Sequence, residues 1–285
     1  MASVGGGETK TSTGSTAPLF VAILLLWSAS VLWEIIVGKR TELIVIVGGF
    51  IFFQICNWVI RRFVSRDSLF INTSVSLIHS AVVSASVVMI LVNQCWIRNW
   101  KSLSSMFEHE ELVDGTWSGA YSALCFSSGY FAYDQTDMLR FKLYKGWIPS
   151  ILTHHVILLA CFTLALYRNV TINYLILTLI CEFHSIFLHI RKLRRMAGIM
   201  QDVVHIEWTL NWVAFFTSRA GAHALITYKL ITDAPKFVQG IQLPLALFGM
   251  LGMNILNLIL GIDLFKAYCR EKYQTRTIAE KQRQS

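Results

Sequence analysis

The chain has 285 residues, of which 54% are hydrophobic and only 15% are charged, and its formal net charge is +8. Soluble domains contain about 25% charged residues, so this composition excludes an ordinary soluble protein and indicates a membrane protein with several spans. The basic residues lie in short segments between apolar runs, which is the pattern of membrane topology and argues against nucleic-acid binding.

Eight apolar runs are long enough to cross a membrane as helices, which need about 20 residues each. They are residues 19–37, 43–60, 72–92, 117–133, 149–167, 172–190, 205–227 and 243–265. The fold class predicted from them is an all-α, polytopic helical bundle, with a transmembrane domain over residues 19–267. Residues 1–18 are rich in Gly, Ser and Thr and are expected to form a disordered tail. Residues 268–285 are expected to form a basic tail.

The distribution of Lys and Arg predicts the orientation, because positively charged loops stay in the cytosol. With eight spans, 17 of the 25 basic residues fall on the amino-terminal side and seven on the opposite side. Both termini are therefore expected in the cytosol. The remaining basic residue, Arg219, falls inside the seventh span, where we expect a structural ion pair with Glu207 or a contact with a polar group on another helix.

Ionisable side chains occur at a shared depth in three spans, although such residues are costly inside a membrane. At ~1.5 Å of rise per residue, His155 lies ~9 Å, His79 ~10 Å and Glu182 ~12 Å from the cytosolic ends of their spans. Asp134 caps the cytosolic end of the fourth span, and Ser185 follows Glu182 on the same helical face. These residues predict a polar pocket that opens toward the cytosolic leaflet.

The adjacent residues His154 and His155 are about 100° apart around a helix. We therefore expect one of them to face the pocket and the other to contact a neighbouring helix. In the functional interpretation, one imidazole acts as a general base or is itself acylated, while Glu182 orients it or takes its proton. In the alternative interpretation, both histidines hydrogen bond to neighbouring helices and hold the bundle together.

His79 and Asp134 are expected either to line the pocket or to form structural hydrogen bonds. Asp134 has a further alternative, since it would also be satisfied by solvent or by pairing with Arg140 or Lys142. No metal site is expected, because the chain has one adjacent His pair and no HxxxH spacing. The six cysteines show neither CxxC nor Cys/His spacing, so a disulfide framework and a zinc site are not expected either.

Five short motifs lie between about residues 40 and 270. They are SLIHS with His79, SSGYFAYD with Tyr130 and Asp134, the pair His154-His155, ICEFHSIFLHIR with Glu182 and Ser185, and FFTSRAG with Arg219. In order and spacing they resemble the TLC-domain family of multispanning lipid proteins, which includes the ceramide synthases. The resemblance implies a bundle of about eight membrane helices, a location in the endoplasmic reticulum and a role in lipid homeostasis.

Ceramide synthases carry a His-His pair followed by a His-Asp-x-x-Asp segment, and this part of the resemblance implies acyl transfer from an acyl-CoA to a sphingoid amine. By the same spacing, Glu182 takes the place of the first aspartate and Ser185 the place of the second. The closer resemblance is to the TLC domain-containing proteins outside the synthase branch. We therefore expect either an acyltransferase with acyl-CoA as co-substrate and no resident cofactor, or a non-catalytic lipid-binding or scaffold protein. The expected catalytic residues are His154, His155 and Glu182, and the expected substrate-binding residues are His79, Tyr130, Asp134 and Ser185.

Overall fold

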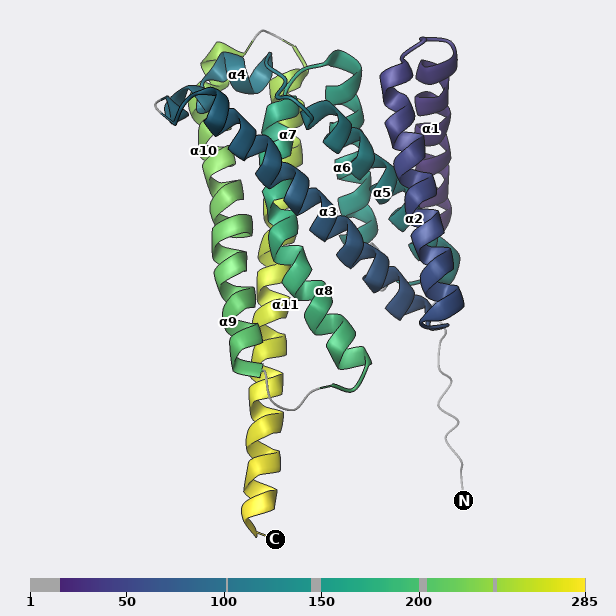
Figure 1. Cartoon of the computed structure of the whole chain (residues 1–285), viewed down its shortest axis with the longest axis vertical. Coiled ribbons are helices and arrows are strands. Elements are labelled where there is room, and N and C mark those ends of the chain that lie inside the picture. The colour runs from purple at the N-terminus through teal and green to yellow at the C-terminus, as the bar shows by residue number, and fades with distance from the viewer. Residues whose placement is uncertain (1–15, 101, 145–149, 200–203, 238–239, 285) are drawn as a thin grey trace, which may run out of the picture.

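The computed structural model describes residues 16–100, 102–144, 150–199, 204–237 and 240–284. Within these ranges the chain is helical and contains no strand. The long helices pack side by side as an all-α bundle (Figure 1), so the expected fold class is confirmed. The tail expected over residues 1–18 lies mostly outside the described residues.

The helices run back and forth between two ends of the bundle. The long ones are α1 (Ala17–Ile36), α2 (Ile44–Phe63), α3 (Ser68–Ile97), α5 (Ala120–Phe141), α6 (Ser150–Arg168), α8 (Glu182–Met196), α9 (Val204–Ala214), α10 (Ala222–Asp233) and α11 (Gln242–Gln284). Shorter elements are η1 (Thr41–Leu43), η2 (Leu103–Phe107), α4 (His109–Val113), α7 (Ile172–Thr178), η3 (Leu179–Cys181), the π-helical η4 (Phe215–Gly221) and η5 (Ala234–Lys236). The start of α1 and the end of α11 lie at the same end of the bundle, the lower one in Figure 1. We call this end the terminal face and the other end the opposite face.

Six segments among the described residues are long and apolar enough to cross a membrane. They are Ala17–Ile36, Thr41–Phe63, Ser68–Ile97, Ser150–Arg168, Ile172–Met196 and Gln242–Tyr273. The chain is therefore a multi-pass membrane protein. The other two expected spans fall on α5, which carries several charged residues, and on the path from α9 to α10, which η4 divides. α5 has 22 residues and is ~33 Å long, enough to match a hydrocarbon core of ~30 Å.

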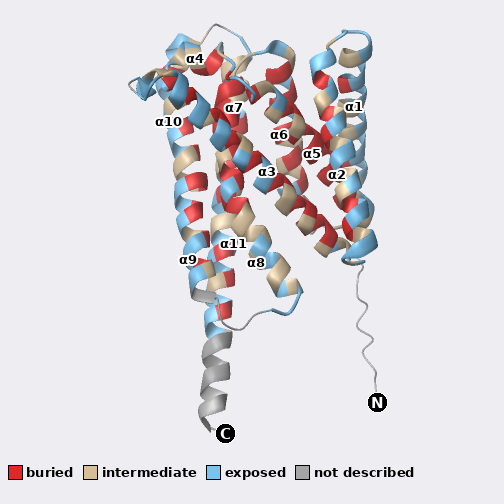
Figure 2. Cartoon of the chain, in the orientation of Figure 1, coloured by how far each residue is buried: buried red, intermediate tan, exposed pale blue. Residues whose placement is uncertain are grey.

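α5 lies inside the bundle, where it packs against α2, α3 and α6. Every position from Ser127 to Gln135 is buried, so burial surrounds this part of the helix. In contrast, α1 is largely exposed at the edge of the bundle (Figure 2). The sequence predicted that this span ends at residue 133, but α5 continues to Phe141. The hydropathy falls at Asp134 because polar residues begin there, yet those residues are buried against other helices and the helix continues.

α3 crosses the bundle obliquely (Figure 1). The Asp67 side chain caps its first turn by accepting a hydrogen bond of 3.1 Å from the Leu69 backbone N–H. With 30 residues the helix is ~45 Å long, and a helix longer than the hydrocarbon core is accommodated by tilting. The tilt carries the polar side of α3 past both α5 and α8.

Candidate functional site

His155 and Asp134 form a buried pair that joins α6 to α5. His155 Nε2 lies 3.3 Å from Asp134 Oδ2, and the two side chains are 3% and 6% exposed. Asp134 therefore lies within its helix, and its partner is neither Arg140 nor Lys142, the two candidates named from the sequence. A proton on Nε2 satisfies this contact and leaves Nδ1 as the acceptor nitrogen of the imidazole.

A polar network extends from Asp134 toward the terminal face. The Asn72 side-chain amide donates to Asp134 Oδ1 at 2.6 Å and to Asp137 Oδ2 at 3.1 Å. Asn57 in turn donates to Asp137 Oδ1 at 3.1 Å and to the Tyr133 hydroxyl at 2.7 Å. Asn72 of α3 thus donates to both carboxylates and Asn57 of α2 to that of Asp137, and these bonds connect α2 and α3 to the last turns of α5.

A second cluster surrounds His79 in the middle of α3. Its imidazole stacks on the Tyr130 ring, with centroids 3.6 Å apart and planes inclined by 8°. His79 Nδ1 lies 3.9 Å from Glu182 Oε2, and the same oxygen accepts a hydrogen bond of 2.7 Å from the Ser80 hydroxyl. The structure therefore brings the predicted residues His79, Tyr130 and Glu182 together across α3, α5 and α8.

His154 faces away from the pair formed by its neighbour. His154 and Glu182 both line a pocket that is enclosed by α6, α7, α10 and α11. The two imidazole rings lie 5.5 Å apart, and the ring of Phe131 contacts both, at 6.3 Å from His154 and 5.7 Å from His155. Of the two adjacent imidazoles, His154 is thus the one that a molecule in the pocket would meet.

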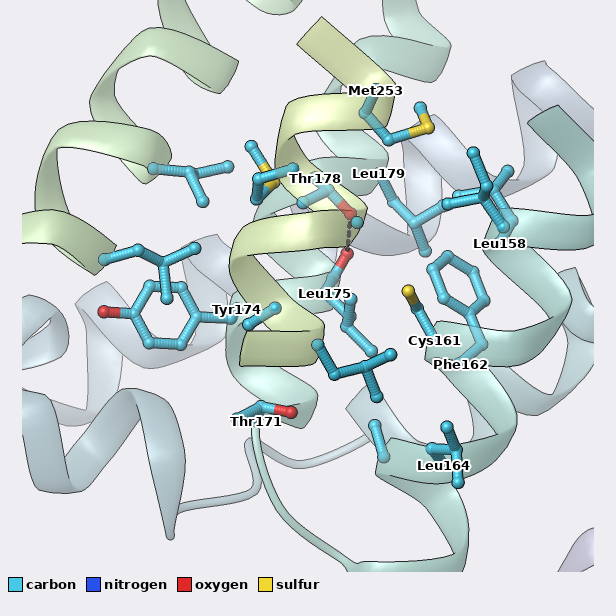
Figure 3. Close-up of a pocket in the computed structure, with 18 of the residues that line it drawn as sticks. Leu158, Cys161, Phe162, Leu164, Thr171, Tyr174, Leu175, Thr178, Leu179 and Met253 are labelled. Atoms are coloured by element: carbon cyan, nitrogen blue, oxygen red, sulfur yellow. Dashed lines mark hydrogen bonds between the residues drawn. The ribbon is translucent and has the colours of Figure 1, made fainter. Parts of the chain in front are cut away.

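The pocket is an apolar slot, shown in Figure 3. Leu158, Cys161 and Phe162 of α6 face Leu175 of α7 and Met253 of α11 across it. Its cavity volume is about 100 Å³, enough for several waters at roughly 10–15 Å³ each. The lining extends along α6 from His154 to Arg168, a rise of ~21 Å, so the slot is long and narrow.

The slot runs from the depth of His154 and Glu182 toward the opposite face, where Arg168, Thr171 and Gln242 line it. The sequence predicted a pocket opening toward the side that holds the termini. On that side, Asp134 and Asp137 are instead joined to Asn72 and Asn57 in the network described above. The apolar space lies on the other side of the polar layer.

Arg219 and Ser185 belong to a separate cluster. Arg219 donates to Ser185 Oγ at 2.7 Å, to His184 Nδ1 at 3.0 Å and to Asn257 Oδ1 at 3.0 Å. The expected ion pair with Glu207 is wrong, because Glu207 contacts Arg194 at 3.1 Å; the alternative, a contact with polar groups on other helices, is what the structure has. Ser185 is therefore not beside the other predicted substrate-binding residues.

A sequence profile described as a TLC domain matches residues 69–266 of the chain. The match covers more than half of its length. The chain belongs to the TLC domain family. The matched TLC domain runs from α3 into α11 and contains all eight residues that the sequence predicted for the site.

Three TLC domain-containing proteins are similar to this chain at comparable sequence identity. The chain is 24% identical to TLC domain-containing protein 2 of Danio rerio, over 59% of the chain and 76% of that protein. It is 26% identical to TLC domain-containing protein 2 of Homo sapiens, over 79% of the chain and 83% of that protein. It is 25% identical to TLC domain-containing protein 1 of Homo sapiens, over 60% of the chain and 66% of that protein. None of these three is named as a ceramide synthase, and no solved structure matches the chain.

Sequence reasoning missed several polar residues around the TLC domain site. Asp137 follows Asp134 by three residues, so it shares a helical face with it, and Asn57 is a lone amide in an apolar run. His184 was not among the predicted site residues, yet its Nδ1 accepts a hydrogen bond from Arg219. Among the described residues, no group of three or more His, Cys, Asp or Glu side chains is arranged to hold a metal ion.

Proposed function

We propose that this TLC domain protein binds the acyl chain of a lipid in the apolar slot and thereby influences the lipid composition of its membrane. The observation that carries the proposal is the slot itself, whose walls are mostly apolar and whose inner end has two ionisable side chains, His154 and Glu182. Ligand sites of this kind combine apolar walls with a few polar groups that fix orientation. Each buried CH₂ group of a chain contributes about 0.8 kcal/mol, so a long narrow slot favours a long chain.

The proposed location is the endoplasmic reticulum, with both termini in the cytosol. The excess of basic residues on the amino-terminal side supports this orientation. In intact microsomes, protease should remove tags from both ends of the chain. Protection of either tag would contradict the proposed orientation.

The inner end of the slot also supports acyl transfer with acyl-CoA as co-substrate. His154 would take the proton from an acceptor amine or hydroxyl as its nitrogen or oxygen attacks the thioester carbonyl. The new amide or ester bond forms as the carbon–sulfur bond breaks, and the CoA thiolate leaves and takes up a proton. Glu182 would stabilise the imidazolium form of His154 by its negative charge.

The alternative is a lipid-binding or scaffold protein without catalysis. It is favoured by Ser185, which stands where the resemblance to ceramide synthases places an aspartate and which accepts a hydrogen bond from Arg219. In this case the His155–Asp134 pair and the contacts of His79 stabilise the bundle, and the slot holds lipid without changing it.

Lipid analysis of cells that lack the protein separates these functions. The cells would be rescued with wild type, with His154→Ala, with Ala246→Trp, which fills the slot from α11, or with Leu258→Trp, whose site on α11 is exposed. If the slot binds lipid, Ala246→Trp fails to restore the lipid profile while Leu258→Trp succeeds at equal protein level. Failure of His154→Ala as well supports acyl transfer, whereas its success supports non-catalytic binding. Rescue by Ala246→Trp would contradict both.

A further inference from the structure

Arg219 is a buried cation without an acidic partner among the described residues. Its side chain is 6% exposed, and its four described partners are uncharged or weakly basic groups: His184 Nδ1, Asn257 Oδ1, Ser185 Oγ and the Cys181 carbonyl oxygen. A guanidinium group stays protonated in proteins, and a buried charge without a counter-ion is costly. The site therefore lacks one negative charge.

The partners of Arg219 also carry hydrogen-bond donors without acceptors. His184 Nδ1 accepts from Arg219, so the proton of the neutral imidazole is on Nε2, and Nε2 has no hydrogen-bond partner in the described part of the chain. Asn257 uses its oxygen for Arg219, and its Nδ2 is likewise buried without a partner. Both side chains are more than nine-tenths buried. A cluster of donors around a cation is the chemistry that binds an anion.

This cluster borders the inner end of the apolar slot. Cys181 lines the slot, and its carbonyl oxygen accepts the hydrogen bond from Arg219. Met253 also lines the slot and lies one helical turn before Asn257 on α11, so the two share a helical face. The π-helical segment η4 carries Arg219 toward these residues, and π-helical turns are frequent at functional sites.

We propose that Arg219 is the head-group site for a single-chain lipid with an anionic head, whose chain occupies the slot. This inference rests on the proposed lipid-binding function and specifies the ligand class. The anion supplies the missing charge and accepts from the unpaired donors of His184 and Asn257. A carboxylate, as in a free fatty acid, and a phosphate, as in a lysophosphatidate, both have this chemistry.

Binding to the purified wild-type protein tests the ligand class without any substitution. Radiolabelled palmitate, hexadecanol and palmitoyl lysophosphatidate would be compared in detergent at about pH 8, where a carboxyl group is ionised. A hydrogen-bonded charge pair predicts that at least one of the two anionic lipids binds about tenfold more tightly than hexadecanol. Whichever anionic lipid binds more tightly identifies the head group as a carboxylate or a phosphate. Equal binding of all three overturns the proposal.

Two substitutions then locate the head and the chain. Arg219→Gln should abolish the preference for the anionic lipid and leave hexadecanol binding within about twofold, while Arg219→Lys should retain part of the preference. Ala246→Trp should reduce the binding of all three probes, and Leu258→Trp should reduce none. An anionic preference that persists in Arg219→Gln overturns the assignment to Arg219. Absence of binding by every probe, hexadecanol included, contradicts the proposed function itself.

Discussion

His155 Nε2 lies 3.3 Å from Asp134 Oδ2, and this pair connects α6 to the central helix α5. The carboxylate is held from the other side by Asn72 at 2.6 Å. One aspartate thus receives contacts from α3 and α6, and the pair separates the roles of the two adjacent histidines. His155 contacts Asp134 in the interior of the bundle, while His154 lines the slot.

Asp134→Ala should destabilise the protein by about 3–5 kcal/mol, because removal of one partner of a buried pair leaves the other polar groups unsatisfied. Asp134→Asn keeps an oxygen that accepts from Asn72, and it should cost less. Thermal unfolding in detergent, followed by intrinsic fluorescence, measures both. Asp263→Ala is the matched control, since that side chain is 66% exposed. Equal Tm values for Asp134→Ala and the control would refute the structural role of the pair.

The two histidines should respond differently to truncation. His155→Ala leaves the Asp134 carboxylate without its partner and should lower the stability by about 3–5 kcal/mol. His154→Ala should cost about 1 kcal/mol, because it removes only one side chain of the slot wall, and should leave palmitate binding close to that of wild type. Tm and palmitate binding of both variants, each against wild type, measure the contrast. A larger loss of Tm in His154→Ala than in His155→Ala would show that His154, and not His155, is the histidine that stabilises the bundle.

Gly129→Ala should destabilise the protein by about 1–3 kcal/mol. A Cβ atom at Gly129 on α5 would contact the Ile46 carbonyl oxygen and would lie 2.7 Å from the Phe50 nitrogen, both on α2. Gly48→Ala provides the control on α2, since nothing lies within 4 Å of the added Cβ. There the gain in helix propensity should raise the stability by about 0.5–1 kcal/mol. An equal change in Tm for Gly129→Ala and Gly48→Ala would contradict the close approach of α5 to α2 at Gly129.

Asp233 at the end of α10 should contribute stability that depends on pH. Burial alone would raise the pKa of its carboxyl group, but hydrogen bonds from Lys229 and Lys236 outweigh burial and hold that pKa below its ordinary value of 3.8. His109 Nδ1 lies 3.7 Å from the same carboxylate. Because the pKa is lowered on folding, the contribution is complete above the unfolded pKa and is lost as the pH falls through the folded pKa.

The measurement is the difference in Tm between wild type and Asp233→Asn. It should favour wild type near pH 7 and shrink as the pH falls below about 4. Asp263→Asn, on an exposed carboxylate, should show a much smaller difference at every pH. If the Asp233→Asn difference grows at acid pH, the sign of the linkage is wrong.

The sequence predicted the helical bundle because apolar runs of sufficient length need no knowledge of their partners. From helical rise, which converts residue number into distance, it also predicted a layer of three ionisable residues, His155, His79 and Glu182. The structure brings His79 to Glu182 and His155 to Asp134, yet only the first of these links joins residues from the predicted layer of three.

Partner choice is what the sequence could not supply. Arg219 lies 38 residues from Asn257 and 35 from His184, and these contacts depend on the rotation of three helices around their axes. The end of α5 was missed for a related reason. The drop in hydropathy at Asp134 and Asp137 predicts the end of a span. In the structure, side-chain amides on α2 and α3 donate hydrogen bonds to these two carboxylates, so both residues can be buried.

The π-helical segment η4 lets the path from α9 to α10 tolerate a change in length. In a regular α-helix each residue adds about 100° of rotation, so a one-residue deletion would turn everything after it. A π-helical turn holds one residue more than an α-helical turn, so deletion of one residue within η4 would close the segment to a regular α-helix and leave α10 in nearly its present phase. Ile226 and Leu230 would stay in the wall of the slot. Such a deletion would instead remove the wide turn that carries Arg219 toward its partners, so a homologue without that residue would keep the slot wall and lose the Arg219 cluster.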